Sequence, residues 1–205
     1  TLVIGKNTLL VEGPSDILYL QAASAALKAV KRPHLSANWA ICPSGGIDKV
    51  LPFVRLFYGN KLNVVVLTDF DRGQKRKLED LHKAALLENE RVILATEIAG
   101  KDEADIEDFF DPRFYVDLVN KTYQLPKAQQ LTVKKLMEAD ETTERLVKKA
   151  EACFRVLPPQ APEFSHFDPS MYLLQHPELL RGTDDPVVKT LERFEAAFER
   201  IGKFT

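Results

Sequence analysis

Four acidic residues follow two apolar runs of the sequence at short spacings. Glu12 ends the first run and Asp16 lies four residues further on, whereas Asp69 and Asp71 directly follow the second run. Clustered carboxylates repel one another, and a divalent cation bound between them offsets that repulsion. Oxygen ligands suit Mg²⁺ or Mn²⁺, and two such ions roughly 3.5–4 Å apart catalyse in-line phosphoryl displacement. The sequence therefore predicts a divalent-metal site for phosphodiester chemistry.

The elements that would position these acids alternate along the first half of the chain. Short apolar runs predict four strands, at residues 8–13, 39–43, 62–68 and 91–95. Helical periodicity lies between them, at residues 15–30, 47–57 and 74–90. This alternation predicts an α/β fold with a mostly parallel sheet of about four strands covered by helices on both faces. Ligands of such sheets bind beyond the carboxyl ends of the strands, where the acids are expected.

The pattern changes after about residue 111. Helical periodicity then dominates, over residues 111–123, 127–154 and 186–202, and a proline-rich connector lies at 158–162. We therefore predict two parts, a catalytic core at residues 1–111 and an appended C-terminal helical segment at 112–205.

A third acidic group follows the fourth predicted strand. It contains Asp102, Glu103, Asp105, Glu107 and Asp108. Glu107 and Asp105 are predicted to reach the metal site as further ligands, Glu107 also with a catalytic role. Asp102 and Glu103 are expected on the solvated face of a helix N-terminus.

Composition limits the partners and the compartment. The formal net charge is −2, so any binding of nucleic acid must use a local basic patch rather than a global field. Cys42 and Cys153 form neither a zinc spacing nor a disulfide framework, which favours a reduced, cytoplasmic setting. No apolar run approaches the roughly 18 residues of a membrane span, and we expect no membrane association.

Two segments are candidates for binding phosphate. Ser44, Gly45 and Gly46 follow the second predicted strand, and their amides suit either a phosphate cradle or a tight turn that needs positive φ. Both interpretations remain open. Arg72 is predicted to bind DNA phosphates at the rim of the site. The basic run at 75–77 fits a solvated helix face better.

Two motifs resemble those of a known fold family. Residues 10–16, Leu-Val-Glu-Gly-Pro-Ser-Asp, resemble the first Toprim motif, and residues 65–72 resemble the Toprim Asp-x-Asp. The resemblance covers about residues 8 to 110. Residues 104–109 and 164–169, together with the helical tail, resemble class 2 members of the OLD (overcoming lysogenization defect) nucleases. This implies a metal-dependent DNA endonuclease that uses two Mg²⁺ or Mn²⁺ ions.

The resemblance also implies an ABC-type ATPase domain before this region and a lysine from the helical segment near the scissile phosphate. The first residue is not methionine, which agrees with a preceding domain, and no Walker A pattern occurs. Lys148 is the first candidate for the catalytic lysine and Lys149 the second, with Lys149 also a candidate DNA contact. Such a charge would stabilise the transition state. His166 is predicted to pack or hydrogen-bond rather than to bind metal.

Two other functions remain open. Asp69-Phe70-Asp71 also matches the nucleophile strand of HAD-like phosphatases, but Gly73 stands where that family has Thr or Val. The phosphatase interpretation also gives Glu12 no role. The second alternative is a non-catalytic Toprim module that only binds DNA or a partner.

Overall fold

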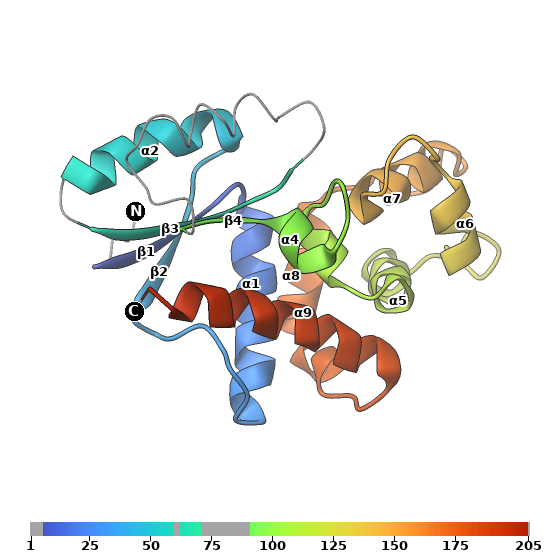
Figure 1. Ribbon diagram of the computed structural model, residues 1–205. Helices are drawn as coiled ribbons and strands as arrows, with labels where there is room; N and C mark the ends of the chain where they lie inside the picture. Colours follow the sequence, from blue (N-terminus) through green and yellow to red (C-terminus); the bar gives the residue numbers. More distant parts are fainter. Residues whose placement is uncertain (1–5, 60–61, 71–90, 205) are drawn as a thin grey trace.

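A parallel four-stranded sheet forms the centre of the molecule, with strand order β2-β1-β3-β4 (Figure 1). The computed structural model describes residues 6–59, 62–70 and 91–204. The strands are β1 (Asn7–Val11), β2 (Trp39–Pro43), β3 (Asn63–Thr68) and β4 (Val92–Leu94), and helices α1 (Pro14–Ala29) and α2 (Ile47–Gly59) follow β1 and β2. Each strand lies at a predicted run, so the predicted parallel α/β sheet is confirmed. The helix predicted at 74–90 lies outside the described residues.

The strands send alternate side chains to two apolar clusters. Leu10 and Val66 join the cluster on the face covered by α2, whereas their neighbours Leu9 and Val65 join the cluster that contains α1. Such alternation is what a sheet buried on both faces requires. The prediction of helices on both faces is therefore confirmed.

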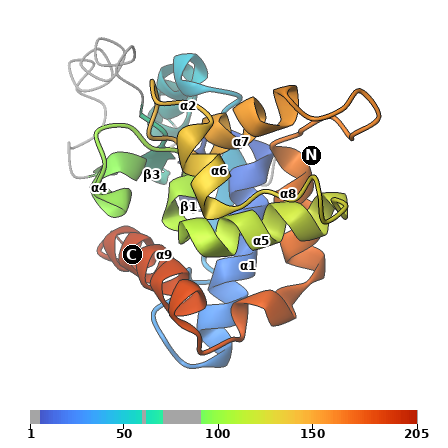
Figure 2. The same ribbon diagram turned by 90° about the vertical axis from the view of Figure 1, so that its right-hand side faces the viewer.

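The second half of the chain is helical and packs against α1. Its elements are α4 (Ala95–Ala99), η3 (Ile106–Phe109), α5 (Pro112–Tyr123), α6 (Val133–Glu138), α7 (Leu146–Arg155), α8 (Phe167–Gln175), η4 (Pro177–Leu180) and α9 (Asp185–Gly202). Figure 2 shows α5, α8 and α9 arranged around α1. One apolar cluster contains side chains from both halves of the chain. The domain boundary at residues 111 and 112 stays a prediction.

The helix predicted over 127–154 is wrong in extent. The structure has two shorter helices there, α6 and α7, separated by residues 139–145. Asp140 accepts hydrogen bonds from the Thr142 amide at 2.9 Å and from its hydroxyl at 2.6 Å. A short polar side chain that bonds the backbone two residues ahead competes with helix formation. Helix α8 was not predicted.

Phe110 joins the helical segment to the core. Its ring meets Tyr19 of α1 at 4.9 Å between centroids, Phe194 of α9 at 5.2 Å and Phe114 of α5 at 5.6 Å. Phe110 lies two residues after Asp108, the last member of the acidic group at 102–108. The same packing that attaches the helices therefore also anchors one of the segments that carry the acids.

Among the residues that the structure describes, no helix combines the length and the apolar character needed to cross a membrane.

Replacing Phe194 with alanine tests whether the helices and the sheet unfold together. Phe194 is fully buried, so the change leaves a cavity that costs about 3–5 kcal/mol of stability. We expect the denaturant midpoint of Trp39 fluorescence, which reports on β2, to fall together with that of far-UV circular dichroism. Glu178→Gln, an exposed change in η4, is the control and leaves both midpoints in place. A Trp39 midpoint unchanged by Phe194→Ala would show that the sheet unfolds independently of α9.

Candidate active site

Glu12 and Asp69 lie side by side at the carboxyl ends of β1 and β3. The two strands pair in parallel, with Leu10 opposite Val66. The carboxylate of Glu12 accepts hydrogen bonds from the Thr68 hydroxyl at 2.6 Å and from the Asp69 amide at 3.1 Å. Because β2 and β3 lie on opposite sides of β1, this is the topological switch point where α/β sheets bind ligands.

Asp16 is held at the N-terminus of α1. One of its carboxylate oxygens accepts hydrogen bonds from the amides of Glu12 at 2.9 Å and Gly13 at 3.0 Å. Pro14 suits the first turn because it has no amide hydrogen to satisfy. These bonds fix Asp16 close to the end of β1, as its spacing from Glu12 predicted.

Asp105 and Glu107 reach the site through a backbone bridge that local sequence patterns do not reveal. Phe70 and Ala104 form an isolated antiparallel bridge, with both N–H···O distances at 3.0 Å. The bridge joins the residue after Asp69 to the residue before Asp105. The third acidic group is thereby brought beside the first two.

One cavity of about 210 Å³ collects these side chains. Five carboxylates from three segments line it, namely Glu12, Asp16, Asp69, Asp105 and Glu107, and two basic residues, Arg145 and His166, also line it. Asp16, Asp105 and Glu107 are only 8%, 2% and 4% exposed. Asp71 lies outside the described residues.

Burial and mutual repulsion disfavour the charged forms of these acids. Burial raises the pKa of Asp16 to about 7 and holds the pKa of Glu12 and Asp105 above their usual range. Burial raises the pKa of Asp69 and Glu107 well above the ordinary value, and the charge of Asp105 adds to the effect. A site that concentrates negative charge at this cost suits a cationic ligand.

The donor set fits a divalent cation in its chemistry, since carboxylate oxygens are the ligands that Mg²⁺ and Mn²⁺ prefer. Within the ranges that the structure describes, however, no three His, Cys, Asp or Glu side chains are arranged so that they could hold a metal ion as they stand. The acids thus share a cavity without forming a ready-made coordination sphere.

Arg145 and His166 were missed as residues of the site. The guanidinium Nε of Arg145 donates to Asp105 at 2.8 Å, across 40 positions of sequence. The ring Nε2 of His166 lies 2.5 Å from a carboxylate oxygen of Glu151, which agrees with its predicted hydrogen-bonding role. No periodicity or motif marks Arg145, because its place depends on the turn that precedes α7.

Neighbouring charges hold α7 against the acidic group. Asp108 is fully buried, is ion-paired to Lys101 and accepts from the Leu146 amide at 3.2 Å. Glu103 accepts from the Glu144 amide at 2.7 Å. Glu103 is only 7% exposed, so its expected place on a solvated face is wrong, whereas Asp102 is exposed as expected.

The loop of Ser44, Gly45 and Gly46 forms a tight turn. Gly45 and Gly46 have φ values of 81° and 109°, which favour glycine. The amides of both glycines donate to the carbonyl of Glu12, at 2.9 and 3.1 Å, and Ser44 donates through its hydroxyl to the Gly46 carbonyl. These groups are used inside the protein, which favours the turn over the phosphate cradle, although Gly46 lines the cavity.

The predicted basic residues do not line the cavity among the side chains that are described. Lys148 binds both oxygens of Glu151 at 3.1 Å. Lys149 is 5% exposed and donates to the carbonyls of Met137 and Asp140. Its buried bonds hold the turn before α7. Arg72 lies outside the described residues.

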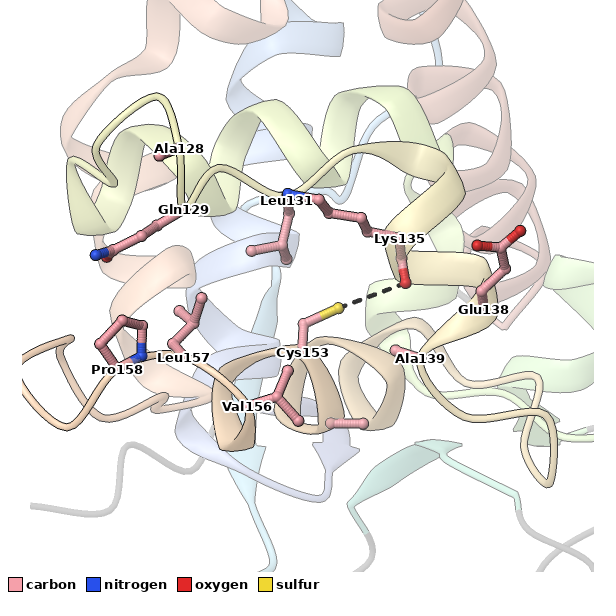
Figure 3. Close-up of a pocket in the computed structure, with 11 residues that line it drawn as sticks. Ala128, Gln129, Leu131, Lys135, Glu138, Ala139, Cys153, Val156, Leu157 and Pro158 are labelled. Atoms are coloured by element: carbon pink, nitrogen blue, oxygen red, sulfur yellow. Dashed lines mark hydrogen bonds between the residues drawn. The ribbon is translucent and has the colours of Figure 1, made fainter.

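A larger cavity of about 730 Å³ lies between α6 and α7 (Figure 3). Its lining is mainly apolar, with Leu131, Val156 and Leu157 on its walls, and Cys153 donates through its Sγ to the Lys135 carbonyl at 3.7 Å. None of the predicted site residues lines it.

Comparisons with known proteins agree with this architecture. Residues 5–71, which contain Glu12, Asp16, Asp69 and Asp71, match the model of the Toprim domain of overcoming lysogenization defect protein-like proteins. No curated protein matches the chain in sequence.

Two solved structures are similar in fold. The C-terminal region of the Burkholderia pseudomallei OLD protein has a TM-score of 0.54 and 13% identity, over 96% of this chain and 100% of that one. The C-terminal region of the Xanthomonas campestris pv. campestris OLD protein, phased with mercury, has a TM-score of 0.52 and 14% identity, over 97% and 98%. Residues 5–71 are therefore similar to the OLD-like Toprim domain, and the chain shares the fold of the C-terminal regions of OLD proteins.

Proposed function

We propose that this chain hydrolyses phosphodiester bonds in DNA with the help of Mg²⁺ or Mn²⁺. The observation that carries the proposal is the convergence of five carboxylates from three segments in one cavity at the switch point of the sheet. The OLD-like Toprim domain supports a nuclease-type module.

In this proposal the acids divide into two groups. Glu12, Asp16 and Asp69 hold the cation at the ends of β1 and β3, joined by Asp71 as its position in the motif implies. Asp105 and Glu107, which line the same cavity, would complete the ligand set and allow for a second ion. Divalent cations at such a site lower the pKa of a bound water and stabilise the attacking and leaving oxygens of the phosphate.

Arg145 supplies positive charge in the cavity itself. It orients Asp105 through the bond at 2.8 Å, and its charge acts on a phosphate bound beside it. The role of Lys148 as catalytic lysine stays a proposal, since its ammonium must leave Glu151 to reach a phosphate.

The wider context also stays a proposal. It comprises a preceding ABC-type ATPase domain, DNA as the substrate and a cytoplasmic location. The Toprim sequence match and the fold shared with the C-terminal regions of OLD proteins support it.

Incubation of supercoiled plasmid with the protein and Mg²⁺ or Mn²⁺ tests the nuclease. We expect nicking and linearisation, and a loss of rate of about 100-fold or more in Asp69→Asn, which keeps the size of the side chain but removes its charge. Glu178→Gln is the matched control, because it removes the charge of an exposed acid that does not line the cavity.

Equal nicking by Asp69→Asn and the unmodified protein would contradict the assignment. DNA binding without nicking by the unmodified protein would instead support the non-catalytic module. Turnover of a fluorogenic phosphomonoester that plasmid does not inhibit would support the phosphatase.

The stability of the metal-free protein should fall as the pH rises. The folded protein binds protons at the acids of the cavity more tightly than the unfolded chain does. The stability that this binding gives at low pH is therefore lost as the pH rises through the pKa of the folded state, which is about 7 for Asp16. Between about pH 6 and pH 8 we expect a loss of about 1–2 kcal/mol, or roughly 3–6 °C in Tm.

Differential scanning calorimetry in EDTA measures this loss. Adding Mg²⁺ should raise Tm more at the higher pH, because the cation binds the ionised form. Glu107→Gln should weaken the pH dependence. A metal-free Tm that is constant or rises over this range would refute the link between the acids and stability.

A further inference from the structure

Three basic groups converge on a single carboxylate beside the acidic cavity. Glu151 of α7 contacts Lys148 at 3.1 Å, Arg155 at 3.5 Å and His166 at 2.5 Å. We call these four residues the Glu151 cluster. The side chains of the three bases are 39%, 73% and 44% exposed, and that of Glu151 is 21% exposed.

The cluster extends outward from the cavity. His166 lines the cavity together with the acids, and Arg145, at the N-terminus of α7, does so as well. Lys148, Glu151 and Arg155 are spaced three and four residues apart, so they lie along one face of α7. A phosphate backbone that passes His166 on its way into the cavity would therefore contact this face of α7.

The charges within the cluster do not cancel. The two charged bases, Lys148 and Arg155, outnumber the single carboxylate of Glu151. Although burial raises its pKa, the bonds from His166 and Lys148 hold the pKa of the Glu151 carboxyl below its usual range, so the carboxylate is ionised. The carboxylate of Glu151 is half-buried but its three bases are exposed to solvent, and ion pairs screened in this way contribute little net stability. Phosphate oxygens can therefore exchange with the Glu151 carboxylate at small cost.

We propose that the Glu151 cluster binds the phosphate backbone of DNA that enters the acidic cavity, with Glu151 as the internal counter-ion that phosphate displaces. The proposal rests on the proposed function for its choice of ligand. While no DNA is bound, Glu151 holds Lys148 and Arg155 of α7 together with His166, which precedes α8. The Glu151 cluster as a whole gives a chain of net charge −2 the local basic patch that binding of nucleic acid requires.

Fluorescence anisotropy with a labelled DNA duplex tests the cluster separately from cleavage. The full chain carries Asp69→Asn throughout, and binding is measured with Mg²⁺ over a series of salt concentrations. Arg155→Gln should weaken binding about 3–10-fold at low salt and reduce the slope of log affinity against log salt by about 1. Glu151→Gln should strengthen binding by a similar factor, because it frees the bases and removes a charge that repels phosphate.

Arg181→Gln is the control, since Arg181 is an exposed arginine at the end of η4, and it should leave affinity and slope unchanged. Circular dichroism melts confirm that each variant is folded. Weaker or unchanged binding in Glu151→Gln would overturn the proposal, as would equal losses in Arg155→Gln and Arg181→Gln or the absence of DNA binding. A failure of plasmid nicking would leave these binding results intact, so the two proposals fail separately.

Discussion

Repulsion between the carboxylates that gather beyond the ends of β1 and β3 is the constraint on which the rest of the structure depends. Five acids line a cavity of about 210 Å³. Each loses hydration and gains like-charged neighbours, which disfavours ionisation. The fold holds them together with directed hydrogen bonds, from Thr68 and the Asp69 amide to Glu12 and from two amides to Asp16.

The helical segment supplies what the sheet alone lacks. Asp108 and Glu103 bind the backbone at the start of α7, and this contact places Arg145 against Asp105. Phe110 anchors the same acidic segment in the aromatic core. The positive charge of the cavity thus depends on packing between parts of the chain that lie far apart in sequence.

The sequence predicted the sheet and most of the acids because both produce local signals. Apolar runs mark buried parallel strands, and the end of a strand places an acid at a known edge. Asp105 and Glu107 were also predicted to reach the site, but the bridge between Phe70 and Ala104 that brings them there has no local signature. Arg145 was missed because its position depends on the turn between α6 and α7. Asp140 hydrogen-bonds the backbone of that turn, whereas the helical periodicity of the sequence continues through it. The same continuity led to the single helix predicted over 127–154. Lys149 was predicted to contact DNA, but its ammonium donates to two backbone carbonyls. A basic residue in a helical stretch of sequence gives no sign of such buried bonds.

The bridge between Phe70 and Ala104 is made of main-chain atoms alone. Spacing set by peptide groups is insensitive to side-chain replacement, provided that the buried position of Ala104 stays small. Substitutions that leave Ala104 small and keep Phe110, Asp108 and Glu103 in place can therefore accumulate around the cavity without separating its acids. In such an architecture, accumulated amino-acid substitutions lower sequence similarity well before they change the arrangement of the acids in the cavity.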